Sequence, residues 1–281
     1  MRRLHLAELE DQPWFPATIR NSMTDLLDFF IRHFRVYDSI VPILHNALKE
    51  ASAHSILDLC SGGAGAIQRV QQILAQEHDF KVEIILSDLY PNKHAYERLI
   101  KLRDSGINYL SSSVDATKVP QNLTGFRTLF TSFHHFDSHD ARKILSNAVK
   151  QGHGIAIFEL SERSFRGALG PLFSAILSFF ITPFLRPFSL KRIFYTYVVP
   201  IIPAAYLFDG LVSQLRSYTP EEMFELARNL GDKEYKWEAG FKKHDFLPFK
   251  INYLVGYKAS DSALLSQPCL KLEHRTPAHD Q

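Results

Sequence analysis

A short apolar run that leads directly into a glycine-rich turn constrains this sequence more than any other feature. Residues 55–60 read SILDLC, the turn SGGAG follows, and helical periodicity begins at residue 66. Glycines permit positive φ angles and close approach of a ligand, and the start of the next helix offers free N–H groups to it. The segment is therefore typical of a nucleotide-type site at the end of a strand.

Apolar runs and amphipathic stretches alternate through the middle of the chain. The predicted strands cover residues 55–60, 82–87, 108–113, 127–131 and 154–158. The predicted helices between them cover residues 66–76, 92–104 and 138–151. This alternation indicates βαβ units and a parallel sheet with helices on both faces.

The ends of the chain add further elements. One or two helices are predicted to start at the cap residue Ser22 and to break near Pro42. A capping box of Thr219 and Glu222 predicts another helix, which should end near Gly231. Two final strands, residues 235–241 and 251–258, then predict an antiparallel hairpin at the edge of the sheet.

Composition excludes several classes of protein. The 281 residues are 46% hydrophobic and 22% charged, which argues for a folded core and against general disorder. The net charge of +2 gives no reason to expect nucleic-acid binding. With two cysteines and no uninterrupted apolar signal segment at the start, we expect a cytoplasmic protein.

Two long uncharged runs lie between the fifth strand and the C-terminal helix. They cover residues 167–185 and 193–208 and are punctuated by prolines. We predict an apolar helical cap over a substrate pocket. An element in peripheral contact with the inner face of a membrane stays open, whereas the prolines and the short second run argue against a transmembrane hairpin.

Two further groups of residues are expected at the same edge of the sheet as the glycine-rich turn. Asp88 ends the second strand, where a carboxylate can accept both hydrogens of a ribose diol. Asp115 and Ala116 follow the third strand, where a polar residue can meet the amino group of adenine. These positions extend the predicted nucleotide site along the sheet.

The ordered set Asp58-x-x-x-Gly62-x-x-Gly65, Ser87-Asp88-Leu89 and Val114-Asp115-Ala116 resembles the class I S-adenosylmethionine-dependent methyltransferases, and the flanking segments resemble a bacterial branch of them. The resemblance covers roughly residues 55–258. It implies a doubly wound, mostly parallel, seven-stranded Rossmann-like sheet with a terminal antiparallel hairpin. The chain then divides into an N-terminal helical extension (1–50), a methyltransferase domain (51–258) with the apolar insertion (165–215), and a mobile tail (259–281).

The resemblance also implies which residues bind S-adenosylmethionine. Asp58 and the turn would face its methionine and ribose, Asp88 its ribose hydroxyls, and Leu89 its adenine. The full set is Asp58, Cys60, Ser61, Gly62, Gly65, Asp88, Leu89, Asp115 and Ala116. One departure is that glycine is common in the family at the positions of Cys60 and Ala64, so the contacts of the turn are less secure than that of Asp88.

Acceptor-side candidates follow the fourth and fifth strands. His134 and His135 are candidate catalytic residues that deprotonate or position an acceptor, with a purely structural role as the alternative. Glu159 is expected to bind substrate or to steady Arg163, with pairing at the surface as the alternative. Trp14 and Phe15 are candidate lid residues over the substrate, with a hydrophobic staple as the alternative.

A metal site is not expected. Three residues near the histidine pair have metal-ligating side chains: Asp137, His139 and Asp140. They fit capping of the following helix better.

These features together predict methyl transfer to a small, apolar acceptor, by O- or C-methylation. A lipid-like acceptor would explain the apolar insertion. Two alternatives stay open. One is an NAD(P)-dependent oxidoreductase, because such enzymes have a similar strand, glycine-rich turn and distal acidic residue. The other is a membrane-associated scaffold without enzymatic activity.

Overall fold

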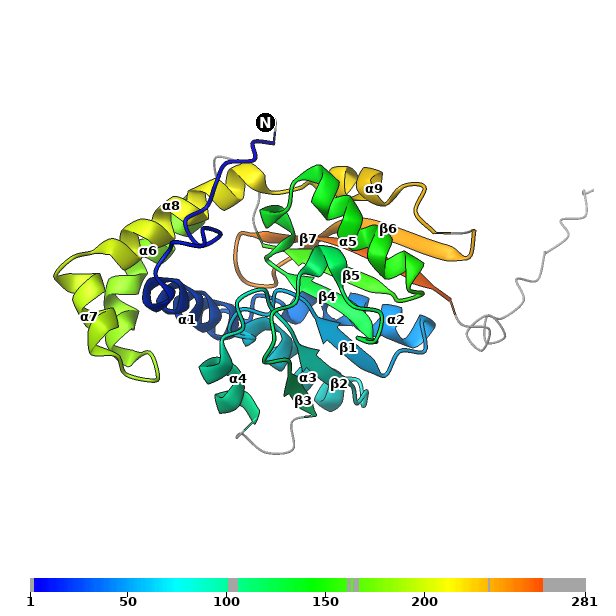
Figure 1. Ribbon diagram of the computed structural model, residues 1–281, viewed down its shortest axis with the longest axis horizontal. Helices are drawn as coiled ribbons and strands as arrows, with labels where there is room; N and C mark the ends of the chain where they lie inside the picture. Colours follow the sequence, from blue (N-terminus) through cyan, green and yellow to red (C-terminus); the bar gives the residue numbers. More distant parts are fainter. Residues whose placement is uncertain (1–2, 101–105, 161–162, 164–166, 232, 260–281) are drawn as a thin grey trace, which may run out of the picture.

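The architecture is a seven-stranded sheet with helices on both faces (Figure 1). The computed structural model describes residues 3–100, 106–160, 163, 167–231 and 233–259. Its strands are β1 (Ser55–Asp58), β2 (Glu83–Leu86), β3 (Ile107–Tyr109), β4 (Phe126–Phe130), β5 (Ile155–Glu159), β6 (Tyr235–Lys243) and β7 (Lys250–Lys258), in the order β3-β2-β1-β4-β5-β7-β6. Strands β1 to β5 are parallel, and β7 is antiparallel to both β5 and β6. The predicted fold class is confirmed.

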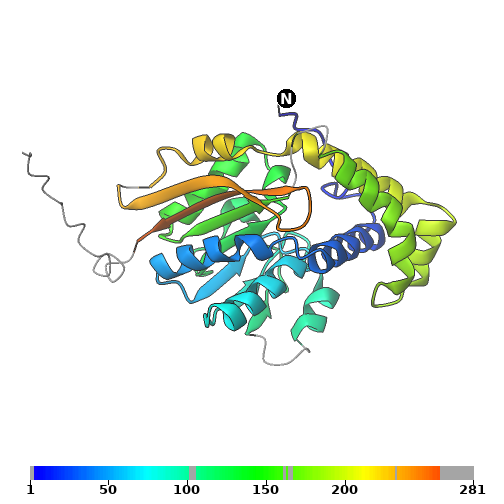
Figure 2. The same cartoon turned by 180° about the vertical axis from the view of Figure 1, so that it is seen from behind.

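Both faces of the sheet are buried, which explains why its strands read as continuous apolar runs. The helices over one face are α2 (Val41–Glu50), α3 (Gly65–Glu77) and α4 (Lys93–Ile100), and those over the other are α5 (Ser138–Lys150) and α9 (Pro220–Ala227) (Figures 1 and 2). Along β5, Ala156 and Phe158 pack toward the first group, whereas Ile155 and Ile157 pack toward the second. This alternation is the two-residue period of a strand.

The first helix, α1 (Ala17–His33), starts earlier than the sequence predicted. The prediction that Ser22 caps this helix is wrong, because Ser22 lies inside the helix and its hydroxyl donates to the Thr18 carbonyl over 2.7 Å. Pro16 precedes the helix instead and has no backbone N–H that the helix would leave unpaired. The expected break is present, since α2 starts at Val41 and holds Pro42 in its first turn.

The predicted start of α9 is confirmed in detail. The Glu222 N–H donates to the Thr219 hydroxyl over 3.2 Å, and the Thr219 N–H donates to the Glu222 carboxylate over 2.9 Å. The helix ends at Ala227, a few residues before the expected position at Gly231. Asn229 already adopts the left-handed conformation with φ 65°, which a helix cannot continue.

The apolar insertion forms α6 (Leu169–Ile181), α7 (Leu190–Tyr197) and α8 (Ile201–Arg216) at one end of the molecule (Figures 1 and 2). These helices pack on one another, and α7 and α8 also pack on α1. Among the described residues, no single helix is long and apolar enough to cross a membrane, and only the pair α7 and α8, bent by 73°, meets the length and composition together. The predicted domain division stays a prediction, and its tail lies outside the described residues after Ala259.

Candidate active site

A cavity of about 560 Å³ lies at the carboxyl ends of β1, β2 and β4. This is the point at which the strand order changes direction, where doubly wound sheets place their ligands. The glycine-rich turn, the loops after β2 and β4, and α1 form most of its wall. The rest comes from Arg216 and from residues 3–12, which we call the N-terminal strap.

The glycine-rich turn takes its shape from left-handed residues. Cys60, Gly62 and Ala64 have φ angles of 55°, 54° and 62°. The Ser61 N–H donates to the Ser87 carbonyl over 3.0 Å, which ties the turn to the end of β2. The turn is therefore a fixed part of the sheet edge, with its residues lining the cavity.

Asp88 supports the turn and also faces the cavity. One carboxylate oxygen accepts the Gly62 N–H over 2.9 Å, and the other accepts the Tyr90 N–H over 2.8 Å. Leu89 lines the cavity beside it and is 47% exposed. A charged acceptor next to an apolar side chain is the combination that a ribose and its attached base require.

Asp58 lies at the end of β1 beneath the turn. Its carboxyl group is buried and accepts the Thr128 hydroxyl over 2.5 Å. Burial raises the pKa of Asp58 to about 7, although the hydrogen bonds from Thr128 and Ser61 oppose that shift. The carboxyl group is therefore poised to ionise next to a positively charged ligand.

A carboxyl group from α1 reaches the same turn. Asp28 accepts the Gly65 N–H over 3.2 Å at the start of α3. A Cβ atom on Gly63 would lie 1.6 Å from the Asp28 carboxylate, so this close approach requires glycine. Burial raises the pKa of Asp28 to about 7, and the Arg32 charge opposes that shift only in part. The N–H groups that open α3 thus face an acidic side chain.

The Asp28 carboxyl makes stability depend on pH. Its ordinary pKa is 3.8, but in the folded protein its pKa is about 7, so between these values the folded state binds the extra proton and the unfolding free energy falls as pH rises. Asp28→Asn keeps an oxygen for Gly65 and removes this titration. We expect the variant to gain about 2 kcal/mol relative to wild type between pH 5 and pH 8 in urea unfolding. Asp79→Asn, at an exposed position, is the matched control, and a difference for Asp28→Asn that does not vary with pH would contradict the assignment.

Acidic side chains outnumber basic ones around the cavity. The lining carboxyl groups are Glu10, Asp11, Asp28, Asp58 and Asp88. The lining cationic or imidazole groups are His5, Arg20, His135 and Arg216. Arg20 donates to the Glu10 and Gln12 carbonyls and lies over the Tyr90 ring, so its charge is already engaged at the rim. Three of the carboxyl groups, Asp28, Asp58 and Asp88, gather at the glycine-rich turn, so a positively charged part of a ligand fits best there.

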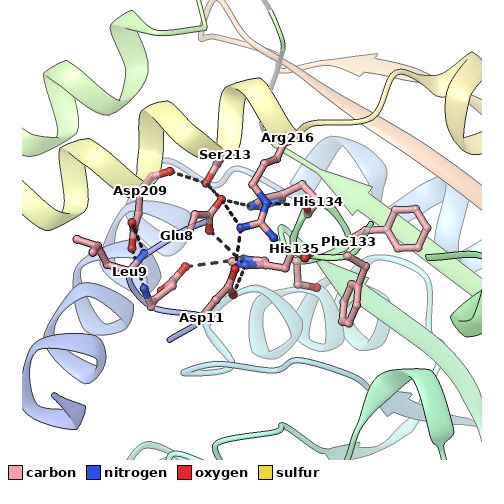
Figure 3. A network of polar contacts seen from close by, with 12 residues as sticks. Glu8, Leu9, Asp11, Phe133, His134, His135, Asp209, Ser213 and Arg216 are labelled. Atoms are coloured by element: carbon pink, nitrogen blue, oxygen red, sulfur yellow. Dashed lines mark hydrogen bonds and ion pairs between the residues drawn. The ribbon is translucent and has the colours of Figure 1, made fainter. Parts of the chain in front are cut away.

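Arg216 anchors the strap from the end of α8 (Figure 3). Its guanidinium is 2% exposed and donates to the Asp11 carboxylate over 2.7 Å and to the His134 carbonyl over 3.1 Å. It also donates to the His135 carbonyl and lies 3.5 Å from the Glu8 carboxylate. One buried cation thus joins the strap, α8 and the loop after β4.

His135 carries a second positive charge in this network. Its Nδ1 lies 2.7 Å from Asp11 and 3.2 Å from Glu8, and its Nε2 lies 3.7 Å from Glu10 (Figure 3). Burial alone would lower the pKa of His135, but these carboxylates raise it to about 10. His135 therefore holds its proton at neutral pH and faces the cavity as a donor.

His134 lies behind this layer and is fully buried. Its Nδ1 is 2.6 Å from the Glu159 carboxylate, which also accepts the Ser132 and Phe133 N–H groups over 3.0 and 2.6 Å. Burial would raise the pKa of Glu159, but His134 and these N–H groups hold it below its ordinary value. Glu159 thus fixes the backbone of the loop after β4.

The strap is also held along α8. The Asp209 carboxylate accepts the Leu9 N–H over 2.7 Å and the Glu10 N–H over 3.0 Å. The Ser213 hydroxyl donates to Glu8 over 3.0 Å (Figure 3). These contacts place the strap over the histidine pair and close that side of the cavity.

The chain matches no protein-family model and no curated protein. Among solved structures, the plantazolicin methyltransferase BpumL in complex with SAH is 12% identical, with a TM-score of 0.50 over 86% of this chain and 88% of that one. An O-methyltransferase family protein from Burkholderia thailandensis is 16% identical, with a TM-score of 0.47, and covers 85% of this chain. Human N-acetylserotonin methyltransferase in complex with SAM is 14% identical, with a TM-score of 0.47, and covers 92% of this chain. This chain spans 60% and 63% of the lengths of the latter two.

Overlap with BpumL over most of both chains agrees with the strand order and the antiparallel β7. The chain has the class I methyltransferase fold. The motif resemblance in the sequence is confirmed at the level of the fold. In this methyltransferase fold the glycine-rich turn after β1 and the acid after β2 stand side by side, as the hydrogen bond from Gly62 to Asp88 shows.

Most of the predicted cofactor residues meet at the cavity of the methyltransferase fold. Those that line it are Asp58, Cys60, Ser61, Gly62, Gly65, Asp88 and Leu89, together with His135 from the catalytic pair. Asp115 and Ala116 do not line it. Asp115 accepts the Thr117 N–H and hydroxyl over 2.8 and 2.7 Å, which caps the short 3-10 helix Ala116–Lys118. The contact of these two residues with adenine stays a prediction.

The predicted substrate residues lie elsewhere. Trp14 is 69% exposed and Phe15 is buried in a cluster with α1, α6 and α8, and neither lines the cavity. Glu159 is buried below the site and does not steady Arg163, which pairs with Glu222 over 2.6 Å. The expectation for Arg163 is wrong because α9 brings the Glu222 carboxylate within its reach.

The expected cap over the pocket is not formed by the apolar insertion. No described residue of 167–208 lines the cavity, and only Arg216 at the end of α8 reaches it. The physical reason is that α7 and α8 pack on the outer side of α1, so α1 and the strap form the cavity wall. The N-terminal strap closes the site instead.

Two groups of side chains have metal-ligating chemistry in the described part of the chain. Glu8, His134 and His135 place one ligand atom each within 4.8 Å of one another, but Arg216 and the protonated His135 already supply positive charge there. The exposed group around Asp137 has a structural role, because Asp137 accepts the Asp140 N–H over 2.8 Å and caps α5. We assign no metal to either group.

Sequence reasoning missed the acidic and basic residues that reach the site from a distance. Asp28, Glu8, Glu10 and Arg216 belong to segments whose local pattern is helical or irregular, with no motif. The only signal was the candidate lid formed by Trp14 and Phe15, which pointed to the N-terminal segment without showing what it covers.

Proposed function

We propose that this protein transfers a methyl group from S-adenosylmethionine to a small acceptor, at an oxygen or carbon atom. The observation that carries the proposal is the Asp28 carboxyl at the glycine-rich turn. In a dinucleotide enzyme the pyrophosphate would lie against the N–H groups that open α3, and an acidic side chain there repels it. A cofactor with a ribose and a net positive charge fits the same site.

Each end of that cofactor has a matching group in this chain. Asp88 offers charged acceptors to the ribose hydroxyls, and Leu89 offers an apolar surface to the base. Asp28 and Asp58, whose pKa values burial raises to about 7, ionise more readily beside an ammonium group. When bound, S-adenosylmethionine supplies a methyl group on a positively charged sulfur. BpumL, which has the same fold, binds SAH.

The acceptor side is the part of the cavity between the loop after β4 and the strap. Phe130 and Phe136 make it apolar, and Glu10 and His135 give it polar groups. Because its carboxylate neighbours keep His135 protonated, we assign it a donor and positioning role, while burial raises the pKa of Glu10 toward a range in which it can take up a proton. Orientation and exclusion of water supply the rest of the rate.

Isothermal titration of the full chain with S-adenosylhomocysteine, NAD and NADP tests the proposal. We expect micromolar binding of S-adenosylhomocysteine and no heat with either nicotinamide, because only the first lacks a pyrophosphate. Nicotinamide binding without S-adenosylhomocysteine binding would favour the oxidoreductase. No binding of any of the three ligands would favour a scaffold without this cofactor.

A further inference from the structure

Helix α6 turns its large apolar side chains outward. The exposed side chains are Leu169, Leu172, Phe173, Ile176, Phe179 and Phe180. Their spacing of three and four residues places them on one face of the helix. The side that packs into the protein carries Pro171, Ala175 and Ser178, with Ile181 as its one large buried residue. A helix that faces water has the reverse arrangement, so this face is built for an apolar environment.

The exposed apolar surface continues onto the neighbouring segments. Its further members, all at least 38% exposed, are Phe184, Phe188, Leu190, Phe194, Tyr197, Val198, Val199, Ile201, Phe208 and Leu211. We call these residues and the exposed side of α6 the insertion face. It lies at the end of the molecule opposite the start of β6 and the end of β7 (Figures 1 and 2). A patch of this extent marks an interaction site.

The charge of the insertion face is positive only. The sequence holds no Asp or Glu from residue 163 to residue 208. Arg186 and Lys191 are exposed at the tip and flank the exposed apolar residues Phe188 and Leu190 in the sequence. Arg192, in contrast, turns inward and donates to Asp25 over 2.6 Å. Two exposed cations thus stand among exposed aromatic and aliphatic groups.

Exposed apolar groups together with positive charge distinguish between two possible partners of the insertion face, a second copy of the chain and a lipid bilayer. A second copy of the chain would bring like charges together across a symmetric contact, with no acidic residue on the face to compensate. A lipid bilayer with anionic headgroups offers both an apolar layer and negative charge. Among the described helices none is long and apolar enough to cross it alone, and α7 meets α8 at 73°, which suits a position along the surface.

We propose that the insertion face docks on the surface of an anionic phospholipid bilayer. The side chains of α6 and of the tip enter the interface, and Arg186 and Lys191 contact the phosphate groups. The proposal goes beyond methyl transfer and does not depend on it, because it rests on α6, α7 and α8 alone. Docking would also bring the cavity close to acceptors that dissolve in membranes.

Flotation of the full chain with phosphatidylcholine vesicles, with and without phosphatidylglycerol, tests the docking. We expect binding that rises with the phosphatidylglycerol fraction. Phe173→Ser with Phe180→Ser should reduce binding to every vesicle by at least about tenfold, because both side chains lose their apolar transfer energy. The matched control is Phe241→Ser with Phe246→Ser, two exposed phenylalanines of the β6–β7 hairpin, which should leave binding unchanged.

Charge reversal separates headgroup recognition from apolar insertion. Arg186→Glu with Lys191→Glu should reduce binding to phosphatidylglycerol vesicles by about tenfold or more, since each surface cation contributes roughly a fivefold effect. Lys242→Glu with Lys243→Glu, on exposed positions of β6, is the control. If both double variants lost vesicle binding equally, the assignment of the insertion face as the docking surface would be overturned.

The proposal is overturned if the wild-type chain does not bind vesicles. It is also overturned if the chain forms a dimer that the Phe173 and Phe180 changes dissociate and binds no vesicles. S-adenosylhomocysteine titration of the same samples reports independently on the folded cavity. Vesicle binding without S-adenosylhomocysteine binding would overturn only the proposed function. S-adenosylhomocysteine binding without vesicle binding would overturn only the docking.

Discussion

Replacing Arg216 with methionine is expected to lower the free energy of unfolding by about 3–5 kcal/mol. The guanidinium is 2% exposed and is shared by the Asp11 carboxylate, the nearby Glu8 carboxylate and the carbonyls of His134 and His135. Methionine fills similar space but leaves the buried Glu8 carboxylate and the half-buried Asp11 carboxylate without this donor. The loss should loosen the strap, because it removes the cation that joins Asp11 and Glu8 to the loop after β4. The contacts that remain include those of Asp209, Ser213 and Arg3.

Urea unfolding followed by circular dichroism measures this effect, and limited proteolysis reports on the strap. The control is Arg228→Met, since Arg228 pairs with Glu225 at the surface with both side chains 62% exposed. A change within about 0.5 kcal/mol is expected there. If Arg216→Met were as mild as Arg228→Met, the buried network would not hold the strap, and closure of the cavity would need another explanation.

The sheet was predictable because its determinants are local. The apolar runs mark strands buried on two faces, and the glycine-rich turn after β1 marks the edge where a ligand binds. The capping box of Thr219 and Glu222 fixes the start of α9 with two hydrogen bonds within four residues. Ser22 shows the limit of such local prediction. A residue that is common at helix N-caps can also lie inside a helix, where its hydroxyl donates to a carbonyl of the preceding turn.

The charged part of the site was not predictable because its contacts join distant segments. Asp28 bonds Gly65 across 37 positions, and Arg216 bonds Asp11 across 205. A buried ion pair leaves no periodicity, and each partner alone looks like a surface residue. The same contacts change the chemistry of the catalytic candidates, since three carboxylates keep His135 protonated.

The apolar insertion was recognised but misplaced. Hydrophobicity along residues 167–208 shows that these side chains avoid water, but it does not say which environment accepts them. The helices turn Pro171, Ala175 and Ser178 inward and Phe173 and Phe180 outward. Small residues inside allow close packing, as at Gly210, where an added Cβ would lie 2.8 Å from Pro171. The large ones are left for a surface outside the protein.

The cofactor assignment itself depends most on Asp88. We expect Asp88→Ala to weaken S-adenosylhomocysteine binding by more than about tenfold, because it removes charge-assisted hydrogen bonds to the ribose hydroxyls. The same change frees the Gly62 N–H from its 2.9 Å contact with the carboxylate and loosens the turn. Asp88→Asn is the milder change, since it keeps one oxygen for the Gly62 N–H but loses the charge and the acceptor of the Tyr90 N–H.

Titration calorimetry of both variants with S-adenosylhomocysteine, next to thermal unfolding, distinguishes these contributions. A ribose role predicts that Asp88→Asn binds weakly while its melting temperature falls less than that of Asp88→Ala. A turn-supporting role alone predicts that Asp88→Asn binds normally and only Asp88→Ala fails. Unchanged affinity in both variants would remove Asp88 from the site and, with it, the main reason to place the ribose beside Gly62.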